Sequence, residues 1–368
     1  MSPSKQLAAI YYGAKDLRIE SIDVPSIEGK PDAVLIKIAW CGICGTDLHE
    51  FESGPILCPT TDKAHPITGA TLPICMGHEF SGIVEEVGSN VKEYQVGDKV
   101  VVEPTISCHT CYACKNDYTN ACESLGWVGL SGGEMNGGLS EFVAIDQSYV
   151  HKLPENVSLQ FGAMVEPLSV AMHAVDRANF QKGATALVLG CGPIGAFTTK
   201  SLIARGASKV IVSEPSGSRR KMAELAGAHH VLDPTKVDIV KEVQKLTGDD
   251  KGVSAAFECA GVQQTLETAI SAVRTRGIVV NVAIWSYEPK VNMNALVLGE
   301  KTVTGVICYK NNHKPAIEAL ASGKIDLEGF VTATTTLNDV IEKGFKELIH
   351  NNEQHVKILV SPKGDSPN

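Results

Sequence analysis

The first 157 residues alternate between short apolar runs and breaks rich in glycine, proline and charge. Residues 7–12, 17–22 and 34–40 are apolar or alternating runs, and another strand-like segment follows at 137–145. Runs of this length, bounded by turn-forming residues, are typical of β-strands. Closely spaced strands of this kind predict a small barrel or sandwich.

From residue 158 the pattern changes to a regular alternation of strands and helices. A helical pattern over residues 159–179 leads to an apolar strand at 185–189, a helical run to residue 204 and a strand at 209–213. Such alternation predicts an α/β domain with a doubly wound parallel sheet. The later members of the series are strands at 231–233, 254–259 and 277–283 and helices at 239–247 and 263–274.

After residue 302 the chain is expected to return to the first domain, because helical patterns at 314–322 and 337–349 precede a final strand at 356–360. A chain of 368 residues is also too long for one ordinary core. We therefore expect two domains: residues 1–157 completed by 306–368, and residues 158–305.

Composition excludes several classes of protein. A net charge of −9, with no basic segment to offset it, argues against nucleic acid as a partner. No apolar run approaches the roughly 18 residues of a membrane span, and the first residues lack a signal-peptide pattern. The eleven cysteines are thus expected to be metal ligands and reduced thiols in a reducing compartment, most simply the cytoplasm.

Four of the cysteines have the spacing of zinc ligands, Cys108-x2-Cys111-x2-Cys114-x7-Cys122. Four thiolates placed so closely suit tetrahedral zinc. They would leave no coordination position for water, so we expect this zinc site to be structural and to hold together a polar lobe. An iron–sulfur cluster is the alternative.

A second candidate site begins where the third predicted strand ends. Residues 41–49, Cys-Gly-Ile-Cys-Gly-Thr-Asp-Leu-His, hold two thiols, a hydroxyl and an imidazole. A thiolate binds zinc, while a hydroxyl and an imidazole can pass a proton outward. Cys41 and Cys44 compete as the ligand, and their Cys-x-x-Cys spacing also permits a redox dithiol. The Pro-rich residues 50–76 are either a surface loop or a loop that shapes a substrate entrance.

The α/β region carries a dinucleotide-binding pattern. A Gly-x-Gly-x-x-Gly motif at 190–195 lies between a strand and a helix, and the next strand ends in Glu214. Glu214 is expected to accept hydrogen bonds from ribose hydroxyls and to repel a 2′-phosphate. Arg219 and Arg220 could hold such a phosphate, but we favour NAD over NADP. The residues assigned to the coenzyme here are Gly190, Gly192, Pro193, Ile194, Gly195, Glu214 and Arg219.

Three segments resemble the zinc-dependent medium-chain alcohol and polyol dehydrogenases. They are residues 42–49, the Gly-His-Glu-x-x-Gly sequence at 77–82 and the Glu-Pro-Leu-Ser sequence at 166–169. Together with the cysteine and glycine motifs they follow the order of that family over the whole chain. The resemblance implies a GroES-like β-barrel catalytic domain, a Rossmann domain, one catalytic zinc, one structural zinc and NAD.

The same resemblance implies roles for individual residues. Cys44, His78 and Glu166 would bind the catalytic zinc, and Cys41 would be a packing residue. Glu79 would lie behind the ligands or exchange with water as a ligand, and it competes with Glu166 for the third position. The remaining implied roles are Thr46 at the zinc-bound oxygen, His49 as the outer proton relay, and Val282, Ala283 and Ile284 beside the nicotinamide.

Within this family, residues 49–74 look most like those of (R,R)-2,3-butanediol dehydrogenases. The similar pieces are His49-Glu-Phe51, Gly54-Pro-Ile56 and Leu72-Pro-Ile74. This implies oxidation of a vicinal diol to a hydroxyketone, and the reverse, by a homodimer or homotetramer. A sorbitol- or xylitol-type polyol dehydrogenase is the alternative enzyme, and a non-catalytic NAD(H)-binding redox sensor is the alternative from another class.

Overall fold

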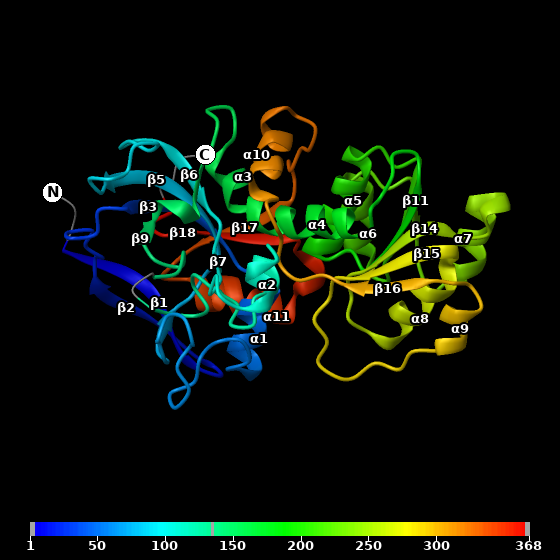
Figure 1. The fold of residues 1–368 in the computed structure, drawn as a ribbon, viewed down its shortest axis with the longest axis horizontal. Helices are drawn as coiled ribbons and strands as arrows, with labels where there is room; N and C mark the ends of the chain where they lie inside the picture. The colour runs from blue at the N-terminus through cyan, green and yellow to red at the C-terminus, as the bar shows by residue number, and fades with distance from the viewer. Residues whose placement is uncertain (1–3, 134–135, 365–368) are drawn as a thin grey trace. The chain divides into compact units, whose positions relative to one another are not determined.

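The computed structural model describes residues 4–133 and 136–364 and divides into two compact units (Figure 1). The first unit comprises the chain up to Glu166, His313–Gly323 and the chain from Val331 onward. The second comprises Pro167–Asn312 and Lys324–Phe330. The first division falls within one helix, Val165–Arg177, and the domain boundaries at residues 157 and 305 stay a prediction. Lys324–Phe330 joins the second unit through Phe330, whose ring lies 5.7 Å from that of Phe197.

The first unit is built mainly from antiparallel strands. Its largest sheet has the order β10-β6-β5-β3-β18-β17, with β9 also paired to β3, and its smaller sheets are β2-β1-β4 and β7-β8. The strands are β1 (Lys5–Gly13), β2 (Asp16–Asp23), β3 (Ala33–Gly42), β4 (Ile74–Cys75), β5 (Glu79–Val87), β6 (Lys99–Val102), β7 (Thr105–Ile106), β8 (Gly126–Trp127), β9 (Phe142–Asp146), β10 (Val150–Lys152), β17 (Val331–Thr336) and β18 (Lys357–Ser361).

The helices of the first unit are short, and the helix Val165–Arg177 (α4), which begins there, lies mainly in the second unit. The helical pattern predicted over 159–179 is two helices, α3 and α4, which meet at Met164. The pattern predicted at 337–349 is a π-helical stretch, η4, continued by α11. The bounds are α1 (Gly45–Ser53), α2 (Tyr112–Lys115), α3 (Leu159–Ala163), α4 (Val165–Arg177), α10 (His313–Ala321), η4 (Val340–Lys346) and α11 (Glu347–His350), with 3-10 turns at η1 (Thr119–Ala121), η2 (Gln147–Tyr149) and η5 (Asn352–Gln354).

The second unit contains the predicted doubly wound sheet. Its six strands pair in parallel in the order β13-β12-β11-β14-β15-β16. The order reverses between β11 and β14, and ligands bind at such a point in open α/β sheets. The elements are β11 (Thr185–Leu189), α5 (Pro193–Ala204), β12 (Lys209–Ser213), α6 (Gly217–Leu225), β13 (His230–Leu232), α7 (Ile239–Thr247), η3 (Gly248–Asp250), β14 (Val253–Glu258), α8 (Gln263–Ala272), β15 (Val273–Asn281), α9 (Met293–Val297) and β16 (Thr302–Gly305).

Helices cover both faces of this sheet (Figure 1). On one face, buried side chains of α7 and α8 pack against β11, β14 and β15, and these residues form one apolar cluster. The strands of the sheet centre are mainly apolar and buried, as expected where both faces are covered.

The Gly-x-Gly-x-x-Gly motif lies where β11 leads into α5, and its three glycines have different local environments. Gly190 has φ +88°, a conformation that side chains disfavour. Gly195 lies in the first turn of α5, and a Cβ atom there would overlap the carbonyl oxygen of Gly190. Gly192 is the N-cap of α5, and a Cβ atom there would meet nothing within 4 Å.

We predict that Gly195→Ala lowers the free energy of unfolding by about 1–3 kcal/mol, because the added methyl must push the Gly190 turn away from the helix. Gly192→Ala is the matched control: it meets no clash and loses only the advantage of glycine over alanine at an N-cap, so it should cost no more than about 1 kcal/mol and less than Gly195→Ala. Thermal and urea denaturation of the ligand-free protein measure both effects. Equal stability of the two variants would contradict the packing argument.

Candidate active site and metal centres

Cys108, Cys111, Cys114 and Cys122 come together in the small lobe that contains α2 and η1, with all four Sγ atoms within 4.8 Å of one another. The Sγ atoms of Cys108 and Cys114 are 4.0 Å apart, as are those of Cys111 and Cys122. Sulfurs bound tetrahedrally to zinc at about 2.3 Å would be about 3.8 Å apart. The lobe therefore needs almost no rearrangement to hold a metal ion.

Backbone amides stabilise negative charge on these sulfurs. The amides of Cys108 and Ser124 donate to the Sγ of Cys122, at 3.3 and 3.4 Å. Hydrogen bonds from the hydroxyl and amide of Thr110 lower the pKa of Cys108 to about 5. Burial and neighbouring thiols raise the pKa of Cys114 to about 12. Four clustered thiols cannot all ionise unaided, and a divalent cation supplies the charge that lets them do so.

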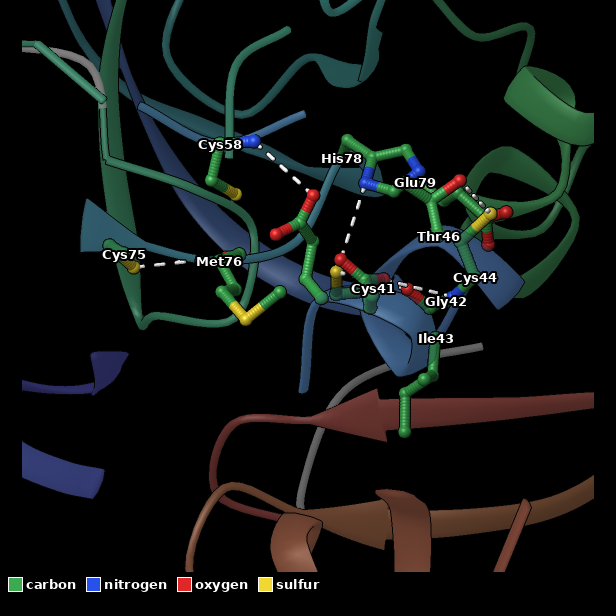
Figure 2. A network of polar contacts seen from close by, with 12 residues as sticks. Cys41, Gly42, Ile43, Cys44, Thr46, Cys58, Cys75, Met76, His78 and Glu79 are labelled. Carbon is green, nitrogen blue, oxygen red and sulfur yellow. Dashed lines mark hydrogen bonds and ion pairs between the residues drawn. The ribbon is translucent and has the colours of Figure 1, made fainter. Parts of the chain in front are cut away.

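The second cluster forms where two neighbouring strands end. The last residue of β3, Gly42, is paired with the first residue of β5, Glu79. Cys44 follows β3 as the N-cap of α1, and His78 directly precedes β5. The ligand atoms of Cys44, His78 and Glu79 lie within 4.8 Å of one another, and Figure 2 shows these side chains converging. Strand pairing therefore brings together residues more than thirty positions apart in the chain.

Asp47 lies next to both Cys44 and His78. Its carboxylate is completely buried, accepts a hydrogen bond from the Cys44 amide at 2.9 Å and lies 3.4 Å from Nδ1 of His78. Nε2 of His78 is thus the nitrogen available to a metal, an arrangement common for metal-binding histidines. Burial lowers the pKa of His78, but the charges of Asp47 and Cys44 outweigh it and raise the pKa well above its ordinary value.

The two predicted proton-transfer residues lie on α1. The hydroxyl of Thr46 is 3.8 Å from the Sγ of Cys44 (Figure 2). His49 is three residues further along the helix, on the same face, and is exposed. A hydroxyl and an imidazole are groups that can carry a proton, and the role of these two as a proton relay stays a prediction.

The two candidate glutamates differ in their surroundings. Both oxygens of Glu79 bind Nζ of Lys357, at 2.9 and 2.6 Å. Glu166, in the first turn of α4, is 6% exposed, and its carboxylate lies outside the group of ligand atoms that are mutually within 4.8 Å. Its charge nevertheless helps to raise the pKa of Lys357, so it lies in the same electrostatic environment. The assignment of Glu166 as third ligand stays a prediction.

Sequence reasoning missed Asp47, Lys357 and the role of Glu50. An aspartate three residues after the N-cap was a usable signal for Asp47, because that position reaches back to the cap amide. A single lysine in the apolar strand 356–360 was the signal for Lys357.

Glu50 attaches the loop after α1 to the helix. Its carboxylate, fully buried, accepts hydrogen bonds from the amides of Ile56, Leu57 and Cys58. Its backbone carbonyl accepts a hydrogen bond from the Tyr11 hydroxyl at 2.7 Å. The segments 49–51 and 54–56, which the sequence singles out together, are therefore joined by one buried carboxylate.

The second unit has a cavity of about 760 Å³ beside the reversal point of its sheet. Gly190, Gly192, Glu214 and Arg219 line it, together with residues of the α7 and α8 regions. Glu214 is 3% exposed, and its carboxylate accepts hydrogen bonds from the amides of Cys191 and Ser216, at 2.7 and 2.8 Å. This carboxylate therefore has a fixed position at the end of β12.

The other residues predicted to bind the coenzyme lie at the start of α5 and after the end of β15. Pro193, Ile194 and Gly195 form the first turn of α5, and Gly195 contacts the Gly190 turn. The guanidinium of Arg220 lies 3.1 Å from the carboxylate of Asp233 and donates hydrogen bonds to two backbone carbonyls. These contacts occupy it, so it is not positioned to bind a phosphate. Three residues do not line the cavity and follow the end of β15: Val282, Ala283 and Ile284.

All eleven cysteines lie in the described residues, and none forms a disulfide. The helices described by the structure include none with the length and apolarity needed to cross a membrane.

Comparison with known proteins gives consistent matches. Residues 30–155 match the family Alcohol dehydrogenase GroES-like domain, and residues 193–322 match the family Zinc-binding dehydrogenase. The chain is 43% identical to an (R,R)-butanediol dehydrogenase of Neisseria gonorrhoeae, over 96% of this chain and 99% of that protein. It is 32% identical to a sorbitol dehydrogenase of Bacillus subtilis, over 98% of each. The crystal structure of 2R,3R-butanediol dehydrogenase from Bacillus subtilis superposes with a TM-score of 0.90 at 42% identity, over 97% of this chain and 99% of that one.

We predict that Cys114→Ser removes one of two zinc ions per chain and exposes the lobe to proteolysis, because three thiolates and a hydroxyl hold zinc more weakly than four thiolates. Elemental analysis and limited proteolysis measure this. Cys308→Ala, which alters a buried cysteine outside both clusters, is the control and should retain both ions. Two ions per chain in Cys114→Ser would refute a structural zinc site.

We also predict that Asp47→Asn weakens metal binding at Cys44 and His78 by about 10–100-fold, because the imidazole loses the carboxylate that orients it. Competition with a chromophoric chelator measures the affinity. Asp62→Asn, at an exposed carboxylate hydrogen-bonded to Thr60, should leave the affinity unchanged. A similar loss in both variants would assign the effect to net charge rather than to orientation.

Proposed function

The chain belongs to the zinc-binding alcohol dehydrogenase family, and from that premise we propose that it interconverts (R,R)-2,3-butanediol and acetoin, with NAD as coenzyme. The observation that carries the proposal is the convergence of Cys44, His78 and Glu79 beside the hydroxyl of Thr46. The full-length similarity to butanediol dehydrogenases, at higher identity than to the sorbitol dehydrogenase, favours the small vicinal diol.

The residues present fit a catalytic zinc. A thiolate, an imidazole oriented by Asp47 and a buried carboxylate are ligands that catalytic zinc accepts, with one position left for substrate. We assign Cys44, His78 and Glu166 as the ligands, with Glu79 next to them. When bound, zinc acts as a Lewis acid that lowers the pKa of a substrate hydroxyl and polarises a ketone carbonyl.

The protein's own residues then move the proton. In alcohol oxidation the hydroxyl of Thr46 acts as a relay: Oγ1, which lies at the edge of the ligand cluster, accepts the proton of the substrate hydroxyl while Thr46 gives its own hydroxyl proton onward in the direction of His49. His49 releases that proton to solvent, because it is exposed on the same face of α1. In ketone reduction the same two groups carry a proton inward.

The second unit is proposed to bind the dinucleotide in the cavity beside β11 and β12. Glu214 accepts hydrogen bonds from the ribose hydroxyls, and its charge repels a 2′-phosphate. Arg220 is bound to Asp233 and so offers little compensation, which supports NAD rather than NADP. The amides at the start of α5 face the pyrophosphate.

A homodimer or homotetramer is proposed from the edge of the parallel sheet. Among the strands in residues 4–133 and 136–364, β16 pairs with β15 alone, and Val303 within it is exposed. Three apolar side chains just before it are more than 60% exposed: Met293, Val297 and Leu298. An open edge with exposed apolar side chains can pair with or be covered by another chain. We also propose a reducing compartment, the cytoplasm, since the cysteines are free thiols.

Turnover of a substrate panel tests the function. We expect kcat/KM for (R,R)-2,3-butanediol with NAD⁺ to exceed that for sorbitol, xylitol and the (S,S)-diol at least tenfold, and NADP⁺ to be the poorer coenzyme. Chiral chromatography of acetoin reduction products gives the stereochemistry. A preference for sorbitol would establish the polyol dehydrogenase instead, and NADH binding with no turnover of any alcohol would establish the redox sensor.

A matched pair of cysteine variants tests which cysteine is the zinc ligand. Cys44→Ser should lose more than 99% of butanediol turnover while its circular dichroism stays native, because it removes a zinc ligand. Cys41→Ala should retain turnover, since Cys41 is a completely buried thiol outside the ligand group. The reverse result would make Cys41 the ligand.

A further inference from the structure

Lys357 is a charged residue that is almost completely buried in the first unit. It lies on β18, is 2% exposed and is surrounded in sequence by apolar residues. Its ammonium hydrogen-bonds Oε1 and Oε2 of Glu79 at 2.9 and 2.6 Å and the carbonyl of Ile43 at 3.2 Å. An ammonium has three hydrogens, so these three bonds use its full donor capacity. A lysine is buried in this way only when it is paired.

Strand register explains how Lys357 reaches Glu79. β3 lies between β18 and β5, and Gly42 of β3 is paired with Leu359 on one side and Glu79 on the other. Lys357 and Leu359 share a face of β18 because side chains alternate along a strand. A Cβ atom on Gly42 would overlap Oε2 of Glu79. The missing side chain of Gly42 is thus the space in which the Glu79 carboxylate lies (Figure 2).

The Glu79 carboxylate is within reach of two centres. One is the cluster of Cys44 and His78, whose ligand atoms lie within 4.8 Å of it. The other is the ammonium of Lys357, which binds both of its oxygens. Because Lys357 and Glu79 are both almost completely buried, each is the other's charge partner inside the protein.

We propose that Lys357 is a positioning residue that holds Glu79 off the catalytic metal, and so reserves the third protein position for Glu166 and the fourth for substrate. The proposal rests on the metal site assigned under the proposed function. Without the ammonium, Glu79 is a buried, unpaired carboxylate beside a divalent cation and moves onto it. The site then has four protein ligands, the closed arrangement of a structural zinc site.

Cobalt(II) provides a readout that does not depend on turnover. Cobalt in an open site binds added imidazole with a shift of its visible bands, whereas cobalt held by four protein ligands does not. Cobalt bound by the four cysteines of the lobe is closed for the same reason and contributes no shift. The imidazole-dependent difference spectrum therefore reports the open site alone.

We expect Lys357→Met to weaken imidazole binding to cobalt at least tenfold and Lys357→Arg, which preserves the ion pair, to retain it. Lys357→Met combined with Glu79→Gln should restore the imidazole shift, because the competing carboxylate is gone. A folded Lys357→Met protein with unchanged imidazole affinity would overturn the proposal. Failure of the double variant to restore the shift in a folded protein would overturn it as well.

If Lys357→Met does not fold, a second experiment tests the proposal. Glu166→Gln alone should lower cobalt affinity at least tenfold, because Glu79 is held by Lys357 and cannot replace the lost ligand. Retained cobalt affinity in Glu166→Gln would show that Glu79 is already bound to the metal, and the proposal would be wrong. Butanediol turnover by the unmodified enzyme tests the proposed function separately, since it depends on neither variant.

Discussion

The candidate metal site depends on one register: Gly42 of β3 opposite Glu79 of β5. Because β3 ends at this point, Cys44 lies at the start of α1. Because β5 begins there, His78 lies beside Cys44. A shift of one residue would turn the Glu79 side chain to the other face of the sheet. Glycine at position 42 is required as well, since any side chain would occupy the space of the Glu79 carboxylate.

Helix α1 organises the surroundings of the metal position with several consecutive side chains. Cys44 caps it, Asp47 orients His78, and Glu50 attaches the following loop through three backbone amides. Thr46 lies beside the sulfur of Cys44, and His49 is exposed one turn further along the helix. The seven residues from Cys44 to Glu50 thus carry a candidate ligand, the carboxylate beside His78, the two predicted proton-transfer groups and the anchor of a loop, so a rigid placement of α1 fixes all of them at once.

Much of the fold could be predicted from local pattern. The parallel sheet is confirmed, because βα alternation and the glycine motif are properties of contiguous sequence. The cysteine cluster was predictable for the same reason, since its four ligands lie within fifteen residues. The pair of Lys357 and Glu79 was not, because its partners are 278 residues apart and meet only through the order of β18, β3 and β5. The break between α3 and α4 was also missed, since apolar periodicity continues across Met164.

The position of Lys357 in the chain has a consequence for biosynthesis. The ribosome releases Cys44, His78 and Glu79 early, but the cation that neutralises Glu79 lies on β18, the last strand of the described chain. Until that strand pairs with β3, the Glu79 carboxylate has no partner ammonium. The final strand of the described chain therefore completes the charge balance of a carboxylate that was synthesised far earlier.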